Sequence, residues 1–122
     1  MNKLELPTGA FLSIRAALLI SVLILGASRE FETITGYHTG EVLDVIKKMD
    51  NIYSSCTSEN IEINLNKKEA AIIFHTLLNY ISGTGEYKSH KYLTNIGKFD
   101  LKVYFVESLE RKLKEIMVHV GN

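Results

Sequence analysis

The chain has 122 residues, the length of one domain, and we expect residues 1–122 to form a single helical unit. Hydrophobic residues make up 46% and charged residues 23%, a composition too apolar for a disordered tail. Fourteen Lys and Arg balance fourteen Asp and Glu, so the chain lacks the basic excess that drives nucleic-acid binding through counterion release. Nucleic acid is therefore not an expected partner, and a net charge of zero favours self-association.

Cysteine usage bears on the compartment. Cys56 is the single cysteine, so no disulfide can form within the chain. This favours a reducing compartment, and we expect a cytoplasmic protein. Its neighbours are serines and threonine with no adjacent base, so we expect a structural residue rather than a reactive thiol.

Residues 10–27 (AFLSIRAALLISVLILGA) allow three interpretations. A transmembrane span needs about 20 apolar residues and would place Arg15 well inside the bilayer. A secretory signal fits the apolar run but not the preceding residues, which lack a basic cluster. We favour a buried core helix, capped by Thr8 or Gly9 and ended by Gly26.

This helix also predicts self-association. Small residues recur at i, i+4 and i+8 as Ser13, Ala17 and Ser21, a ridge that would let another helix approach closely. Leu19 and Ile24 add apolar surface that a domain of this size would struggle to cover. We therefore expect these five residues to form the interface of a homo-oligomer.

Three further helices are predicted from apolar periodicity. Thr39 begins the second, and the spacing from Val42 to Tyr53 gives it one apolar face. Asn66 and Glu69 resemble a capping box at the start of the third, which Gly83 should end. The last spans about 101–120 with Asp100 as its cap, although alternation leaves a strand open over 99–106.

Short strands are possible at 31–35 and 61–65, where apolar and polar residues alternate. A faint repeat supports a paired arrangement. Leu4-Glu5-Leu6 precedes the first helix as Ile61-Glu62-Ile63 precedes the third, and residues 42–53 resemble residues 106–117. The expected fold is mainly α, with four helices in two hairpins and room for two short strands.

No catalytic or metal-binding signature is present in the sequence. The histidines do not form an HxxH or HExxH pair, and no Cys or carboxylate lies at ligand spacing from them. We expect His75 to face solvent on the polar side of the third helix. The sequence therefore predicts no enzyme, no metal and no cofactor.

The connection over residues 83–100 (GTGEYKSHKYLTNIGKFD) is longer than most structureless loops. It interleaves aromatic and basic side chains, which can stack a ring and hold an anion. The candidate ligand-binding residues are Tyr87, Lys88, His90, Lys91 and Tyr92. The alternative is a solvated surface loop with no ligand.

Length, an apolar surface and the lack of catalytic motifs together favour a non-enzymatic binding or regulatory module that acts through protein–protein interaction. An inhibitor or immunity-type accessory protein of a mobile element is one form of that role. Two alternatives remain: a small-ligand or nucleotide binder using the 83–100 loop, and a small membrane-associated protein using residues 10–27.

Overall fold

A computed structural model describes residues 3–25, 36–55, 59–82 and 100–118. In chain order the elements are β1 (Lys3–Pro7), α1 (Thr8–Leu25), α3 (Thr39–Ser55), β2 (Asn60–Asn64) and α4 (Lys67–Ser82). A last helical rod combines α6 (Leu101–Tyr104), a π-helical turn (Phe105–Leu109) and α7 (Glu110–Met117). The predicted mainly α fold with a minor β component is confirmed.

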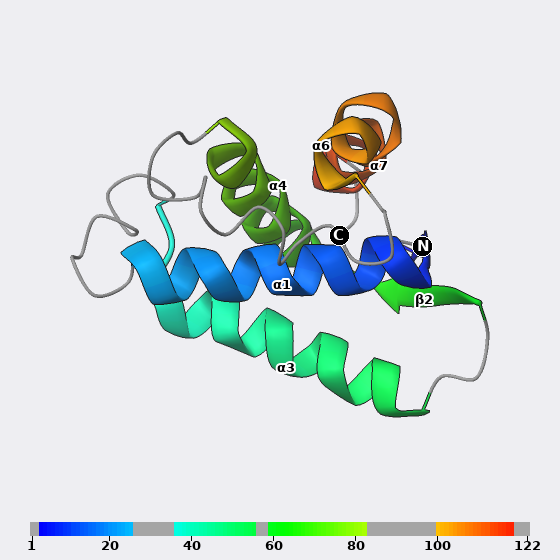
Figure 1. Ribbon diagram of the computed structural model, residues 1–122, viewed down its shortest axis with the longest axis horizontal. Helices are drawn as coiled ribbons and strands as arrows, with labels where there is room; N and C mark the ends of the chain where they lie inside the picture. The colour runs from blue at the N-terminus through cyan, green and yellow to red at the C-terminus, as the bar shows by residue number, and fades with distance from the viewer. Residues whose placement is uncertain (1–2, 26–35, 56–58, 83–99, 119–122) are drawn as a thin grey trace.

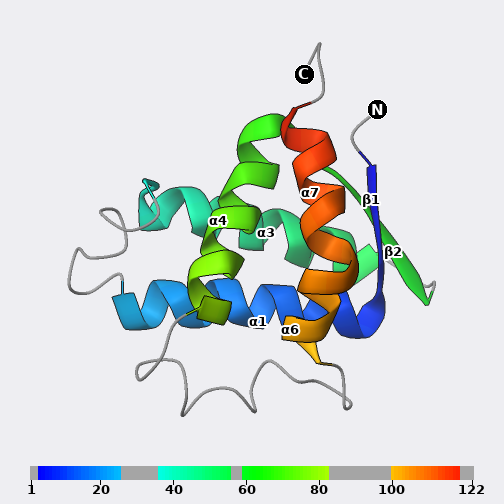
Figure 2. The same cartoon turned by 90° about the horizontal axis from the view of Figure 1, so that it is seen from above.

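The helices form layers around α1 (Figure 1). The α3 helix lies along one side of α1, while α4 and the last rod lie on the other side. Figure 2 shows α4 and α7 side by side, crossing over α1 at a steep angle. The four helices therefore make two packed hairpins, α1 with α3 and α4 with α7, as the sequence predicted.

The two strands pair with each other in antiparallel orientation. Leu4 lies opposite Ile63 and Leu6 opposite Ile61, and all four side chains are buried in the core. The strand expected at 61–65 is confirmed within a residue, and its partner is the Leu4-Glu5-Leu6 segment. The strand expected at 31–35 lies outside the described residues.

One backbone hydrogen bond shows which opposite residue pairs of the sheet are hydrogen-bonded and which are not. The Thr8 amide donates to the Glu59 carbonyl at 3.0 Å, which continues the same register beyond the strands. Because hydrogen-bonded and non-hydrogen-bonded pairs alternate in antiparallel sheets, Pro7 takes a non-hydrogen-bonded position and loses no ladder bond. Glu5 takes another such position directly opposite Glu62 on the exposed face, where Glu62 Oε2 lies 3.9 Å from Lys3 Nζ.

Among the described elements, the order strand, helix, helix occurs twice, once in each half of the chain. The paired strands join the two halves, and α1 also packs against α4. Two pairs of equivalent positions in the faint sequence repeat are alike in burial, since Val45 and Leu109 are both buried, as are Met49 and Leu113. The first pair differs, because Val42 is buried and Val106 is 65% exposed.

The last rod is helical from Leu101, so the strand alternative over 99–106 is wrong. Leu101, Phe105, Leu109 and Leu113 recur every four residues, and all four are buried. On a regular α-helix, residues four apart drift by about 40° around the axis. The wider π-helical turn compensates for that drift and keeps the stripe facing the core.

The helix caps predicted at Asn66 with Glu69 and at Asp100 are confirmed, while the helix ends predicted at Gly26 and Gly83 lie outside the described residues. Asn66 Oδ1 accepts from the Glu69 amide at 2.8 Å, and Glu69 Oε1 accepts from the Asn66 amide at 3.0 Å. Asp100 Oδ1 accepts from the Val103 amide at 3.2 Å. Each contact satisfies a backbone N–H that has no partner inside its helix.

Candidate interaction surface

The α1 helix has a buried side and an outward side. Its buried side contains Phe11, Ile14 and Leu18 together with the small-residue ridge of Ser13, Ala17 and Ser21; all six are at most 1% exposed. The core-helix interpretation of this segment is therefore supported by its packing. Within the described residues, no helix is both long and apolar enough to cross a membrane.

Burial of the ridge corrects one expectation. Ser13, Ala17 and Ser21 are fully buried within a single copy of the chain, so they do not lie on a surface that a second copy reaches. The close approach that these small residues permit is used inside the domain. Of the other two residues assigned to an oligomer interface, Leu19 is partly exposed, and the side chain of Ile24 lies outside the described residues.

The outward side of α1 is also apolar. Leu12, Leu19 and Val22 are partly buried against the core, and Leu23 is 67% exposed. Arg15 is the one charged residue in the 18-residue helix. An amphipathic surface helix would place charged or polar residues at such positions, so this side lacks the usual water-facing chemistry.

The neighbouring α3 helix extends this surface. The Arg15 guanidinium forms a two-pronged ion pair with Asp50, including Nη2 to Oδ2 at 3.2 Å. The rings of Phe11 and Tyr53 stack with centroids 6.1 Å apart. These two contacts fix an antiparallel register between α1 and α3.

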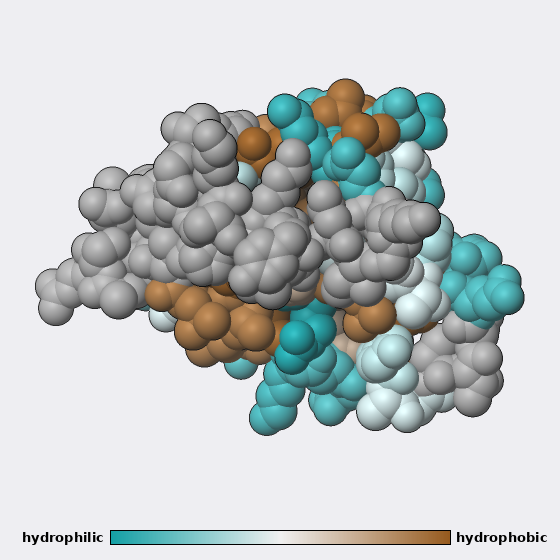
Figure 3. Space-filling model, viewed as in Figure 1, coloured by the Kyte–Doolittle hydropathy of each residue, from teal (hydrophilic) through white to brown (hydrophobic). Residues whose placement is uncertain are grey.

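Extending that register by two helical turns places Leu43, which is 44% exposed, beside the C-terminal half of α1. We call the resulting surface the α1–α3 face. Its apolar members are Leu12, Leu19, Val22, Leu23 and Leu43. Figure 3 shows hydrophobic side chains gathered over this part of the two helices, next to a hydrophilic group.

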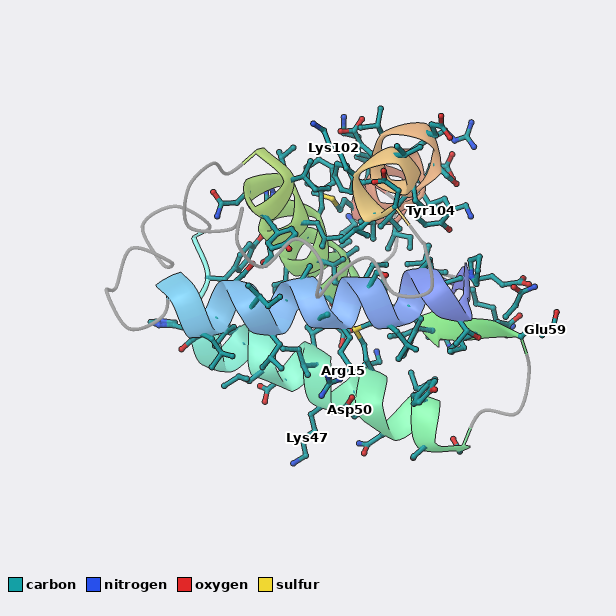
Figure 4. The ribbon with its side chains drawn as sticks, in the orientation of Figure 1. Arg15, Lys47, Asp50, Glu59, Lys102 and Tyr104 are labelled. Carbon is teal, nitrogen blue, oxygen red and sulfur yellow. The ribbon has the colours of Figure 1, made fainter. Side chains whose placement is uncertain are left out.

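Figure 4, in the same orientation, shows Arg15 and Asp50 pointing toward one another between α1 and α3, while Lys47 points away from the molecule. The hydrogen bonds that Arg15 donates to Asp50 raise the pKa of Arg15 above its ordinary value, while partial burial acts in the opposite direction. The arginine is therefore charged at any physiological pH, and its charge is balanced within the face.

A second polar cluster lies between α3 and α4. Lys68 Nζ contacts Glu41 Oε1 at 3.0 Å, and Lys48 Nζ contacts Glu69 Oε1 at 2.9 Å. The hydrogen bond with Lys68 lowers the pKa of Glu41, outweighing partial desolvation. Both ion pairs join one helix to the other, so this cluster holds the two hairpins together.

His75 lies beside this cluster, and its expected solvent-facing position is wrong. The imidazole is partly buried, 6.1 Å from the Tyr37 ring centroid and 5.1 Å from that of Phe74. Burial raises the pKa of the Tyr37 hydroxyl, and the charge of Glu41 adds to that effect. Sequence periodicity missed this contact because Tyr37 comes from a segment before α3 with no helical pattern of its own.

The other predicted site falls on the connection between α4 and the last rod. Its candidate residues Tyr87, Lys88, His90, Lys91 and Tyr92 lie outside the described residues, and so does Cys56. Within the described part of the chain, no group of three or more His, Cys, Asp or Glu side chains could hold a metal ion. The α1–α3 face is the candidate site that the described residues support.

Comparisons of this chain with protein-family models, with curated proteins and with solved structures find no match.

Proposed function

We propose that this protein is a non-enzymatic binding module that acts by occupying another protein through the α1–α3 face. One observation carries the proposal: the outward side of α1 is apolar where a surface helix is normally polar. The last rod and its C-cap also expose three valines, but they are interspersed with exposed charged side chains such as Arg111, Lys114 and Glu115. Contiguous exposed apolar surface on a small domain is typical of an interaction site.

The chemistry of the face fits protein rather than a small molecule. Its apolar side chains come from two helices that lie side by side and form a broad surface, whereas small ligands bind in concave pockets. Leu23 and Leu43 supply apolar area that a partner removes from water, which stabilises a complex by about 25 cal/mol per Å². An inhibitor or immunity-type role, in which binding blocks the partner, would need no further chemistry from this chain.

The Arg15–Asp50 pair gives the face a polar centre. Two aligned contacts from a planar guanidinium hold both side chains in place before a partner arrives. A pre-organised pair costs less ordering on association than two free side chains. It also disfavours partners that would bury it without supplying hydrogen bonds, which gives the apolar surface some selectivity.

The test is capture of partners from the native host, with a matched pair of variants. Leu23→Glu alters the face, and Val106→Glu alters a side chain of similar exposure (65%) on the last rod. Tagged wild-type protein and Val106→Glu should retain the same protein partner, and Leu23→Glu should lose it. Retention of that partner by Leu23→Glu would contradict the proposal.

A further inference from the structure

The charges around the α1–α3 face balance one another. Its flank on α3 carries Asp44, Lys47 and Asp50 at successive three-residue intervals, all exposed, and α1 adds Arg15. The four formal charges sum to zero, as do those of the whole chain. Among the described residues, neither Asp44 nor Lys47 has an ion-pair partner of its own.

This pattern narrows the choice of partner. A strongly basic or acidic protein would gain nothing from a face with equal numbers of both signs. A charged surface that binds its own copy through ion pairs must carry both signs, because each patch meets an identical one under two-fold symmetry. The negative and positive charges that alternate along α3 meet this requirement. An antiparallel second copy can place each Lys47 beside the Asp44 of the other copy.

We propose that the occupant of the α1–α3 face is a second copy of this chain, in an isologous two-fold dimer. This inference rests on the proposed function, because it names the partner of the same face. The apolar residues form the centre of the interface, and the Asp44 and Lys47 side chains form reciprocal ion pairs at its edge. Unlike the ridge of Ser13, Ala17 and Ser21, every group used here is at least partly exposed in one copy.

The area of the α1–α3 face sets the affinity that we expect for the dimer. An 18-residue helix is about 27 Å long, and two helices about 10 Å apart present a face roughly 20 Å wide. That is about 500 Å² per copy, or about 1,000 Å² in total, which lies at the lower end for specific interfaces. We therefore expect a reversible dimer with a dissociation constant on the order of 10 μM.

The first experiment measures self-association by sedimentation velocity between about 1 and 200 μM, a range that brackets the expected constant. Wild-type protein and Val106→Glu should shift from monomer to dimer across this range. Leu23→Glu should weaken dimerisation at least about 100-fold, because each interface buries the new carboxylate twice. A wild-type monomer at the highest concentration would overturn the inference, as would a Leu23→Glu protein that dimerises normally.

The second experiment tests the reciprocal pairing directly. Asp44→Lys alone and Lys47→Glu alone each place like charges opposite one another, so each should dimerise about tenfold less well than wild type. In an equimolar mixture the two variants complement one another, and dimerisation should return to within about threefold of wild type. Dimerisation no better in the mixture than in either variant alone would exclude this two-fold arrangement.

Failure here is distinguishable from failure of the proposed function. If wild-type protein is monomeric but loses a captured host protein on Leu23→Glu substitution, the face is a binding site and the second-copy inference is wrong. If wild-type protein is monomeric and Leu23→Glu loses nothing, both proposals are wrong.

Discussion

Two leucines in α1 allow the contribution of side-chain burial to stability to be measured within a single helix. Leu18 is 0% exposed on the core side, and Leu23 is 67% exposed on the α1–α3 face. Replacing either with alanine removes the same three carbon atoms and changes helix propensity by the same small amount. The difference in stability between Leu18→Ala and Leu23→Ala therefore measures the difference in their surroundings.

At Leu18, three carbon atoms at about 0.8 kcal/mol each give about 2.4 kcal/mol, and the cavity left behind raises the expected loss to about 3 kcal/mol. At Leu23, about a third of the side chain is buried, so the loss should be no more than about 0.8 kcal/mol. An unfolding entropy of about 2.1 cal/mol/K per residue gives about 0.26 kcal/mol/K for this chain. The expected decreases in Tm are therefore about 12 °C and at most about 3 °C.

Thermal unfolding followed by circular dichroism measures both values. The protein should be held at about 1 μM, well below the expected dissociation constant, so that association does not contribute to the result. Equal losses at the two positions would refute the reasoning, because they would mean that the outward side of α1 is packed as tightly as its core side.

Three further outcomes follow from the described contacts. The Thr76 hydroxyl is fully buried and has no hydrogen-bond partner among the described residues, so Thr76→Val should leave stability unchanged or raise it by up to about 1 kcal/mol in urea unfolding. Asn66→Ala removes half of the reciprocal cap with Glu69 and should lower stability by about 1 kcal/mol in the same assay. Glu41 has a lowered pKa because of Lys68, so its stabilising contribution is present above the ordinary glutamate pKa and disappears as pH falls through the lowered value. The Tm difference between wild type and Lys68→Met should therefore be larger at neutral pH than at about pH 3, and a difference independent of pH would contradict this assignment.

Local sequence signals predicted most of the fold because the elements that they mark are stabilised locally. The capping pair of Asn66 and Glu69 and the cap at Asp100 each use contacts within four residues, and all are present as expected. The strand alternative for the last helix arose because residues four apart, such as Leu101 and Phe105, also lie on one face of a strand. The apolar spacing alone therefore could not separate helix from strand. Only a π-helical turn, which single-residue periodicity does not reveal, lets Leu101 and Leu113 face the same core.

The candidate face was harder to predict, because exposure depends on tertiary packing. In an almost uniformly apolar helix, periodicity cannot say which side is buried. Small residues at Ser13 and Ala17 suggested a close contact between copies, but that contact occurs within the chain. The informative signal was Arg15, because a lone charge in an apolar helix must lie on a side that reaches water or a partner such as Asp50.

The most direct test of the central claim is site-specific photo-crosslinking in native host cells. A benzophenone amino acid at position 23 or 43 places the reactive group on the α1–α3 face, and one at position 106 places it on the last rod at similar exposure. Irradiation should give a covalent protein adduct from positions 23 and 43, whether with a second copy or another protein, and none from position 106. An adduct from position 106 alone, or no adduct from positions 23 and 43, would contradict the account.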